Sequence, residues 1–279
     1  MKQKWDIEKL NNCYKQSVTE FADGFTHAAN QGIPRFIEEY RISRVKDAVA
    51  PWIIEKNIQA ENQKKKILDI GCGHGWYPFR LIDKWNFDGH ITAVDASEHN
   101  IKIFNEEITR RNYQDKISAN IANAEALPFP DSTFDTVYST ESLEHIESPA
   151  KFFREASRVL KPGGTLIITT PSGPIHSFWK CLFWMPSKIK RIFKPSKQSP
   201  EDRIFDNPLS WRQIKSAADG NNLELINYHK SVMLPHESYI QFLPEFIQHL
   251  LILRAHLFEK LGPLTQWTGL HHIIRYRKQ

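Results

Sequence analysis

The sequence predicts an α/β protein built on a parallel β-sheet. From about residue 66 onward, short apolar runs rich in β-branched residues alternate with stretches of helical periodicity. This is the pattern of strands joined by helical crossovers. A turn with glycine at alternate positions, Gly71 to Gly75, follows the first apolar run. The chain has 279 residues, which suits one large domain of this class with appended segments.

The first strand, the glycine turn and the first helix after them form one unit. Residues 67–70 are apolar except for Asp69, as expected of a buried strand, and residues 76–85 have the spacing of a helix. Glycine permits positive φ and close approach of a ligand, and a helix start offers unpaired N–H groups. The same turn could also serve only to join a strand to a helix. The glycines alone therefore do not decide between binding and structure.

The later elements continue the alternation, and their crossovers are expected to be right-handed. Apolar, β-branched runs predict strands over residues 89–95, 117–122, 136–140, 165–170, 223–228 and 271–277. Amphipathic spacing predicts helices over residues 98–110, 141–146, 150–160 and 208–218. Lys161-Pro-Gly-Gly164 is expected to end the third of these helices.

Two helical regions are expected beside this core. Residues 1–60 are predicted to form an N-terminal helical cap on the domain that contains the sheet, residues 61–279, because apolar residues recur in 1–60 at helical spacing with Lys and Arg between them. The cap either packs on the edge of the sheet or covers a ligand site. Residues 234–268 predict a helical insertion, which either packs against the cap or walls an apolar pocket.

An aromatic and basic insertion is predicted over residues 174–200. Between residues 176 and 197, Trp and Phe are mixed with Lys and Arg, and no Asp or Glu occurs. Such a composition is typical of a segment that touches a membrane surface. A cover over the substrate would account for it too, whereas RNA binding is disfavoured because no nucleic-acid motif accompanies it.

Composition narrows the class of protein. The net charge of +5 is too small to indicate nucleic acid, and three scattered cysteines predict reduced thiols rather than a disulfide framework or a zinc site. Neither an apolar signal core nor a run long enough to span a bilayer is present. We therefore expect a cytoplasmic protein, with peripheral contact at the inner membrane surface left open.

Asp95 ends the second predicted strand. A nucleotide-binding fold places a carboxylate about 20 residues beyond the glycine loop, where it accepts from the ribose hydroxyls. Alternatively, Asp95 and Ser97 only cap the helix that follows. The position relative to the loop favours binding.

Five stretches together resemble the class I S-adenosylmethionine-dependent methyltransferases. They are residues 67–75 (ILDIGCGHG), 94–95 (VD), 124–131 (AEALPFPD), 134–135 (FD) and 160–166 (LKPGGTL). The resemblance covers about residues 60–172. It implies a Rossmann-like, doubly wound sheet of seven strands whose last strand is antiparallel, with S-adenosylmethionine as the cofactor.

The resemblance also implies contacts to the cofactor. Gly71 and Gly73 would pack against its amino-acid part, Asp69 would orient its ammonium group directly or through water, and Asp95 would hold the ribose. Ala124 would offer its N–H to the adenine. The remaining predicted cofactor contacts are Cys72, Ala96, Asn123 and Ser139.

Position 123 departs from the family pattern, in which an aspartate usually accepts from the adenine amino group. Asn123 can still accept through its side-chain oxygen. As a neutral partner it should form a weaker hydrogen bond than a carboxylate would.

Glu141, Glu144 and His145 are the candidate catalytic residues. On a helix their spacing would put all three on one face, at the carboxyl edge of the sheet. They could bind a divalent metal ion such as Mg²⁺ that acidifies a hydroxyl, or His145 alone could be a general base. The pattern is similar to that of ubiquinone-pathway O-methyltransferases, where these side chains are linked to metal. A capped helix start would also account for the acids.

The sequence thus predicts a methyltransferase acting on a small or lipid-linked acceptor, with a hydroxyl oxygen as the favoured target. C- or N-methylation without metal is the alternative enzyme function, and a non-catalytic cofactor-binding subunit is the alternative outside catalysis. His271 and His272 are expected to be structural, because no spacing ties them to a metal site.

Overall fold

The structure is a computed structural model and describes residues 45–55, 64–173, 207–231 and 271–279. Most of the predicted N-terminal cap, the whole aromatic and basic insertion (174–200) and the whole helical insertion (234–268) lie outside these ranges. The predicted domain boundaries therefore stay predictions.

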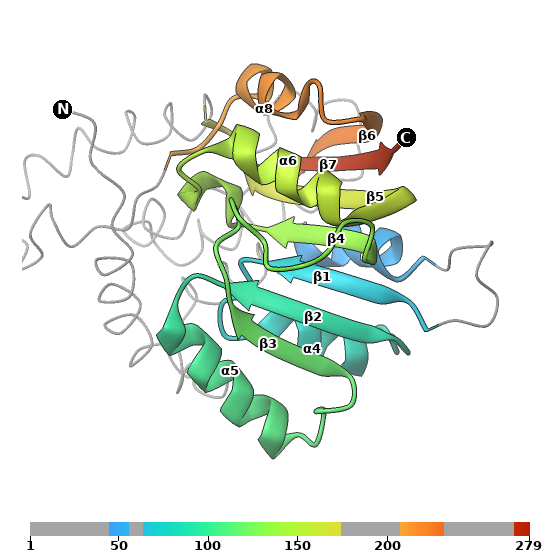
Figure 1. Cartoon of the computed structure of the whole chain (residues 1–279), viewed down its shortest axis with the longest axis vertical. Helices are drawn as coiled ribbons and strands as arrows, with labels where there is room; N and C mark the ends of the chain where they lie inside the picture. The colour runs from blue at the N-terminus through green and yellow to red at the C-terminus, as the bar shows by residue number, and fades with distance from the viewer. Residues whose placement is uncertain (1–44, 56–63, 174–206, 232–270) are drawn as a thin grey trace, which may run out of the picture.

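A seven-stranded sheet forms the centre of the described chain, in the order β3-β2-β1-β4-β5-β7-β6 (Figure 1). The strands are β1 Lys66–Ile70, β2 His90–Asp95, β3 Ile117–Ile121, β4 Phe134–Thr140, β5 Leu160–Pro171, β6 Leu223–Ser231 and β7 His271–Lys278. Strands β1 to β5 pair in parallel, whereas β7 is antiparallel to both β5 and β6. The predicted fold class is confirmed, including the antiparallel last strand.

Helices connect the strands where the sequence periodicity predicts them. The helices between the strands are α4 Trp76–Asp83, α5 Glu98–Arg110, α6 Pro149–Val159 and α8 Trp211–Ala218, with a short 3₁₀ helix, η2, at Leu143–His145. A further helical segment covers residues 45–54. Side-chain caps stabilise the first turns of two helices. The Ser97 side chain accepts from the N–H of Asn100 at the start of α5, and Ser210 and Gln213 form a capping box at the start of α8.

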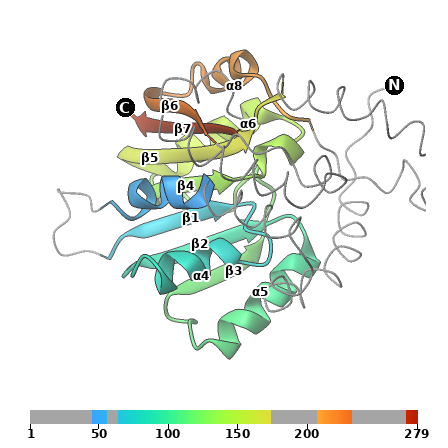
Figure 2. The ribbon, with the colours of Figure 1, turned by 180° about the vertical axis from the view of Figure 1, so that it is seen from behind.

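Alternate residues of the strands enter two separate cores, one on each face of the sheet. Ile67 and Tyr138 pack with α4, α5 and residues 45–54, whereas Leu68 and Val137 pack with α6 and α8. Figure 1 shows α6 on one face, and Figure 2 shows α4 and residues 45–54 on the other. Each fully buried side chain of this size stabilises the fold by about 1.5–3 kcal/mol. The strands are therefore apolar on both faces, as in other parallel sheets.

Residues 45–54 are fastened to the α4 side by polar as well as apolar contacts. Asp47 accepts hydrogen bonds from Arg80 at 2.9 and 2.7 Å and from Lys84 at 2.7 Å, while the Tyr77 hydroxyl donates to the carbonyl of Lys46 at 2.6 Å. The three hydrogen bonds from cations hold the pKa of Asp47 below its usual value against the opposing effect of burial. This docking brings Lys46 to the carboxyl edge of the sheet.

Asp135 ties the amino ends of three strands together. Its carboxylate accepts from the Lys66 N–H at 2.8 Å and from the Lys161 ammonium at 2.7 Å. The helix before Lys161-Pro-Gly-Gly164 ends at Val159, which confirms the predicted break. The four residues themselves lie within β5, and Lys161 is held to β4 by this ion pair. The family motifs at residues 134–135 and 160–166 therefore stabilise the sheet and do not line the pocket.

No helix in the described ranges is long and apolar enough to cross a membrane.

Candidate cofactor and active site

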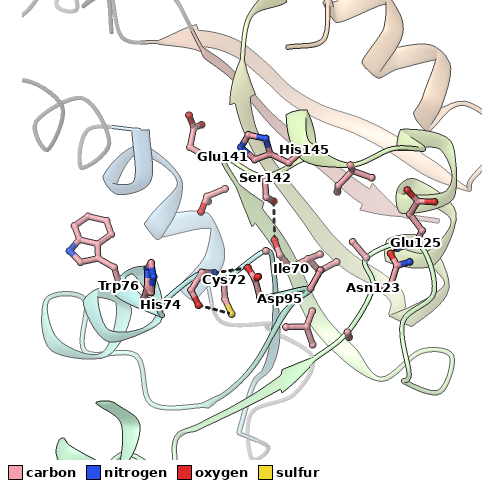
Figure 3. Close-up of a pocket in the computed structure, with 18 of the residues that line it drawn as sticks. Ile70, Cys72, His74, Trp76, Asp95, Asn123, Glu125, Glu141, Ser142 and His145 are labelled. Carbon is pink, nitrogen blue, oxygen red and sulfur yellow. Dashed lines mark hydrogen bonds between the residues drawn. The ribbon is translucent and has the colours of Figure 1, made fainter. Parts of the chain in front are cut away.

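A pocket opens at the carboxyl ends of β1, β2 and β4 (Figure 3). In a doubly wound sheet this edge is where ligands bind, because the strand order reverses there. The pocket is lined by Lys46, Ile70, Gly71, Cys72, Gly73, His74, Trp76, Val94, Asp95, Ala96, Ala122, Asn123, Ala124, Glu125, Thr140, Glu141, Ser142, His145 and Ile146. Seven of the nine residues predicted to contact the cofactor are among them: Gly71, Cys72, Gly73, Asp95, Ala96, Asn123 and Ala124.

The three glycines of the loop have different reasons to be glycine, although all have positive φ. A Cβ on Gly71 would lie 2.5 Å from the Cβ of Ser142, and one on Gly75 would overlap the Phe104 ring. A Cβ on Gly73 would meet no protein atom within 4 Å, and Gly73 lines the pocket. Gly73 therefore leaves open space that a ligand can occupy, while the other two permit packing.

Hydrogen bonds fix the loop to the end of β2. The N–H groups of Gly71 and Cys72 both donate to the carbonyl of Val94, at 2.8 and 3.1 Å, and the N–H of Gly73 donates to Asp95 Oδ2 at 2.9 Å. These backbone donors are thus used within the protein. The pocket floor is pre-formed by them rather than assembled around a ligand.

Asp95 serves both the helix start and the pocket. Besides Gly73, its carboxylate accepts from the N–H of Ser97 at 2.9 Å and from the side-chain amide of Asn100 at 3.3 Å. Burial raises the pKa of Asp95, and these hydrogen bonds oppose the shift. Ser97 is the N-cap itself. The two alternatives from the sequence are therefore compatible: Asp95 supports the cap and also lines the pocket.

The Asn123 side chain is partly committed to its own turn. Its Oδ1 accepts from the N–H of Glu125 at 2.9 Å, and Glu125 Oε1 accepts from the N–H of Ser148 at 2.8 Å. A carbonyl oxygen has two lone pairs, so Asn123 can accept one more hydrogen bond from a ligand. The turn presents Asn123 and Ala124 at one end of the pocket.

Two predicted cofactor contacts lie behind the pocket wall. Asp69 is 2% exposed, and burial raises its pKa to about 7, with the nearby Lys46 ammonium opposing the shift. Ser139 is fully buried and is hydrogen-bonded to Ser142, whose hydroxyl also donates to the carbonyl of Ile70. Neither residue is among those that line the pocket, so their contacts to the cofactor stay predictions.

The helix predicted over residues 141–146 was wrong. Glu141 has φ 56°, and the chain forms only the 3₁₀ turn η2 from Leu143 to His145. The Glu141 N–H donates to the carbonyl of Thr169 at 2.9 Å, which holds the residue in this unusual conformation. This tertiary contact overrides the helical spacing.

Consequently Glu141, Glu144 and His145 do not share one helical face. Glu144 is buried and accepts from the Thr170 hydroxyl at 2.9 Å, whereas Glu141 and His145 line the pocket. Among the residues that the structure describes, no group of three His, Cys, Asp or Glu is placed to hold a metal ion. The geometry behind the predicted metal site is therefore incorrect, and no step below depends on a metal.

Glu141 is held by the neighbouring strands β5 and β7. Its Oε1 accepts from the Thr169 hydroxyl at 3.0 Å, and its Oε2 lies 2.9 Å from Nε2 of His271. His271 is 2% exposed and begins β7. The sequence expectation that His271 is purely structural missed this contact, since residues 130 apart in the chain carry no common pattern. A carboxylate is thus fixed at the pocket wall.

Lys46 and Trp76 are pocket residues that the sequence reading did not identify. The Lys46 Nζ lies 4.9 Å from the centre of the Trp76 ring. The spacing of apolar residues had indicated that the region before residue 55 either packs on the sheet or covers the site. In the described part of this region Val49 and Ile53 are buried in the core, and Lys46 lines the pocket.

Comparison with known proteins agrees with this fold and site. A family model described as "Methyltransferase domain" matches residues 68–168. The chain is 35% identical over 155 residues to demethylmenaquinone methyltransferase of Symbiobacterium thermophilum, covering 50% of this chain and 61% of that protein. It is 30% identical over 163 residues to O-methyltransferase rstn1 of Aspergillus nomiae, covering 58% of this chain and 70% of that protein.

A solved structure shares the fold at low identity. Geranyl diphosphate C-methyltransferase from Streptomyces coelicolor, solved with Mg²⁺, geranyl diphosphate and S-adenosyl-L-homocysteine, superposes with a TM-score of 0.55 at 18% identity, over 85% of this chain and 78% of that one. The chain spans about half the length of many of the curated relatives that it matches.

The fold, the pocket and these relatives define a methyltransferase domain of the Rossmann-like type. The chain belongs to the class I S-adenosylmethionine-dependent methyltransferase superfamily, as the family motifs predicted.

Proposed function

We propose that this protein transfers a methyl group from S-adenosylmethionine to a small acceptor molecule. The observation that carries the proposal is the pre-formed pocket, whose floor is open above Gly73 and whose wall includes Asp95. The residues fit the cofactor: a carboxylate is available for vicinal hydroxyls, and the Asn123–Ala124 turn offers polar groups for a base.

The cofactor's parts suit successive parts of the pocket. Adenine fits beside Asn123 and Ala124, and the ribose fits beside Asp95. Trp76 and Glu141 are at the end of the pocket away from Asn123 and Glu125 (Figure 3). The amino-acid part and the reacting methyl therefore belong at that end, next to the acceptor.

When bound, S-adenosylmethionine supplies a methyl group that its sulfonium already activates. What the chain must add is alignment of the acceptor, exclusion of water and removal of the acceptor's proton. Glu141 and His145 line the pocket, so both are in place to act on an acceptor hydroxyl. The fixed Glu141 carboxylate is the better proton acceptor candidate, because Thr169 and His271 hold it in one orientation.

A hydroxyl oxygen is the acceptor atom that this arrangement supports best. The relatives include an O-methyltransferase and a C-methyltransferase by name, so the atom does not follow from family membership. C- or N-methylation, with His145 as a base or binding group, is the second candidate. Demethylmenaquinone, named for one relative, is an apolar acceptor, which supports a lipid-linked molecule here.

Calorimetry with S-adenosylmethionine and its demethylated product tests the cofactor, and mass spectrometry of cell extract incubated with enzyme and cofactor tests the transfer. We expect micromolar binding and at least one extract component that gains CH₂. Glu141→Gln should still bind the cofactor and lose most of the product, whereas Lys215→Met, on the exposed face of α8 and outside the pocket, should behave like the wild type. A wild-type protein that gives no heat with the cofactor would contradict the proposal, and binding without any methylated product would favour a non-catalytic subunit.

A further inference from the structure

Lys46 is a cation at the pocket wall without an ion pair of its own among the described residues. Its Nζ lies against two rings, 4.9 Å from the centre of Trp76 and 5.2 Å from that of Tyr77. Asp69 and Glu141 act on it as nearby charges, and Arg80 and Cys72 have weaker effects. Burial lowers the pKa of Lys46, and the two carboxylates oppose that shift. An anion placed beside the ammonium would offset the cost of burying it.

The pocket otherwise carries negative charge. Among its described lining residues, Lys46 is the sole Lys or Arg, while Asp95, Glu125 and Glu141 are acidic. The proposed cofactor has two cationic groups, the sulfonium and the α-ammonium, and one anionic group, the α-carboxylate. The acidic residues suit the cations, so the carboxylate needs a different partner.

The glycine loop has few donors left for that carboxylate. The N–H groups of Gly71 and Cys72 both donate to Val94, that of Gly73 donates to Asp95, and that of Gly75 donates to the carbonyl of Cys72 at 3.0 Å. A phosphate-binding loop would instead leave such N–H groups directed at its anion. Lys46 is the described lining residue that carries the right charge for this role.

Lys46 lies at the matching end of the pocket. It contacts Trp76, and Trp76 and Glu141 are on the side away from Asn123 (Figure 3). With adenine at Asn123 and ribose at Asp95, the amino-acid part extends toward Trp76. The ammonium of Lys46 is held there by the fixed rings and by the docking of residues 45–54 on α4.

We propose that Lys46 binds the α-carboxylate of S-adenosylmethionine, so that residues 45–54 complete the cofactor site. This inference rests on the proposed function and adds to it a recognition residue outside the family motifs. It makes binding depend on the carboxylate itself, and therefore distinguishes the cofactor from analogues that lack this group.

Calorimetry with two ligands tests this assignment without any methyl acceptor. The ligands are S-adenosylmethionine and decarboxylated S-adenosylmethionine, which has hydrogen in place of the α-carboxylate. The wild type should bind the first at least about 10-fold more tightly, as expected for a charge-assisted contact. Lys46→Met should remove most of that difference by weakening S-adenosylmethionine alone. Lys46→Arg should keep part of it, because the charge remains.

Lys215→Met is the matched control, since Lys215 is an exposed lysine of α8 that neither lines the pocket nor takes part in the docking of residues 45–54. It should leave both affinities unchanged. Normal binding of the decarboxylated ligand by Lys46→Met would show that this variant is folded. Equal binding of both ligands by the wild type, unchanged selectivity in Lys46→Met, or equal weakening of both ligands by that variant would each overturn the assignment. A wild type that binds neither ligand would instead overturn the proposed function.

Discussion

At the scale of single residues, Gly73 and Gly75 differ in what lies beside them: Gly73 borders open space that a ligand can occupy, whereas a side chain packs against Gly75. Alanine at either position must adopt positive φ, which costs about 1–2 kcal/mol. At Gly73 the added methyl meets only the pocket, so Gly73→Ala should lower the free energy of unfolding by no more than this amount. At Gly75 it overlaps the fully buried Phe104 ring, so the total cost of Gly75→Ala should be roughly 2–5 kcal/mol.

Urea unfolding measures these costs, and calorimetry measures binding of S-adenosylmethionine. We expect Gly73→Ala to raise the dissociation constant at least about 10-fold while it stays folded, because its methyl occupies ligand space. The two variants thus serve as controls for each other. Normal cofactor binding by a stable Gly73→Ala protein would show that the ligand does not approach this glycine.

The same residues show which parts of the site can be predicted from sequence. Gly73 and Asp95 were predicted because a strand end and a tight turn fix them locally, whatever packs around them. Lys46 and His271 were missed because they reach the pocket through tertiary contacts with distant segments. Asp69 and Ser139 belong to the predicted set but do not line the pocket. Whether a residue at a strand end reaches a pocket depends on which neighbours cover it.

At the scale of elements, the strands were easier to predict than the segment that carries the candidate catalytic residues. The strands are apolar on both faces, so their runs are visible in the sequence. Residues 141–146 have helical spacing, but Thr169 and His271 hold Glu141 outside a helix. No window of nearby residues contains that information, and the helical prediction failed for this reason.

His272 links β7 to β6 and to the segment just before α8, and its protonation should weaken these links. The ring is 1% exposed; its Nδ1 accepts from the Tyr228 hydroxyl at 3.0 Å and its Nε2–H donates to the carbonyl of Leu209 at 3.2 Å. Burial, with help from the Lys230 charge, lowers the pKa of His272 to about 4. The folded protein therefore holds a neutral ring, whereas the unfolded chain binds a proton near pH 6.5.

Because the unfolded state binds more protons between these two values, stability should fall as pH is lowered through this window. From about pH 7.5 to about pH 5, His272 alone should reduce the free energy of unfolding by about 2 kcal/mol. Urea unfolding of the wild type and of His272→Gln at both pH values measures the effect, since other titrating groups cancel in the comparison. An identical pH dependence in the two proteins would contradict the assignment.

At the scale of the whole molecule, the pocket is a composite of segments spread over a hundred residues. The glycine loop, the end of β2, the turn at residues 122–125 and the wall at 140–146 come from one half of the sheet, and Lys46 comes from the layer before it. Each segment is placed by the strand order rather than by its neighbours in sequence. The fold therefore specifies where the cofactor fits, while the acceptor depends on what surrounds the Glu141 end.

The sequence also predicts that the whole protein binds to anionic membrane surfaces. Residues 176–197, outside the described ranges, mix Trp and Phe with Lys and Arg and contain no acid. On an anionic surface, each basic residue in contact contributes about 1 kcal/mol, and aromatic side chains can enter the interface. We expect the protein to float with vesicles containing phosphatidylglycerol and much less with phosphatidylcholine alone. Replacing Phe178, Trp179 and Trp184 by serine should abolish flotation while cofactor binding persists. Equal flotation of both proteins would exclude these aromatic residues as a membrane contact and favour a cover over the substrate.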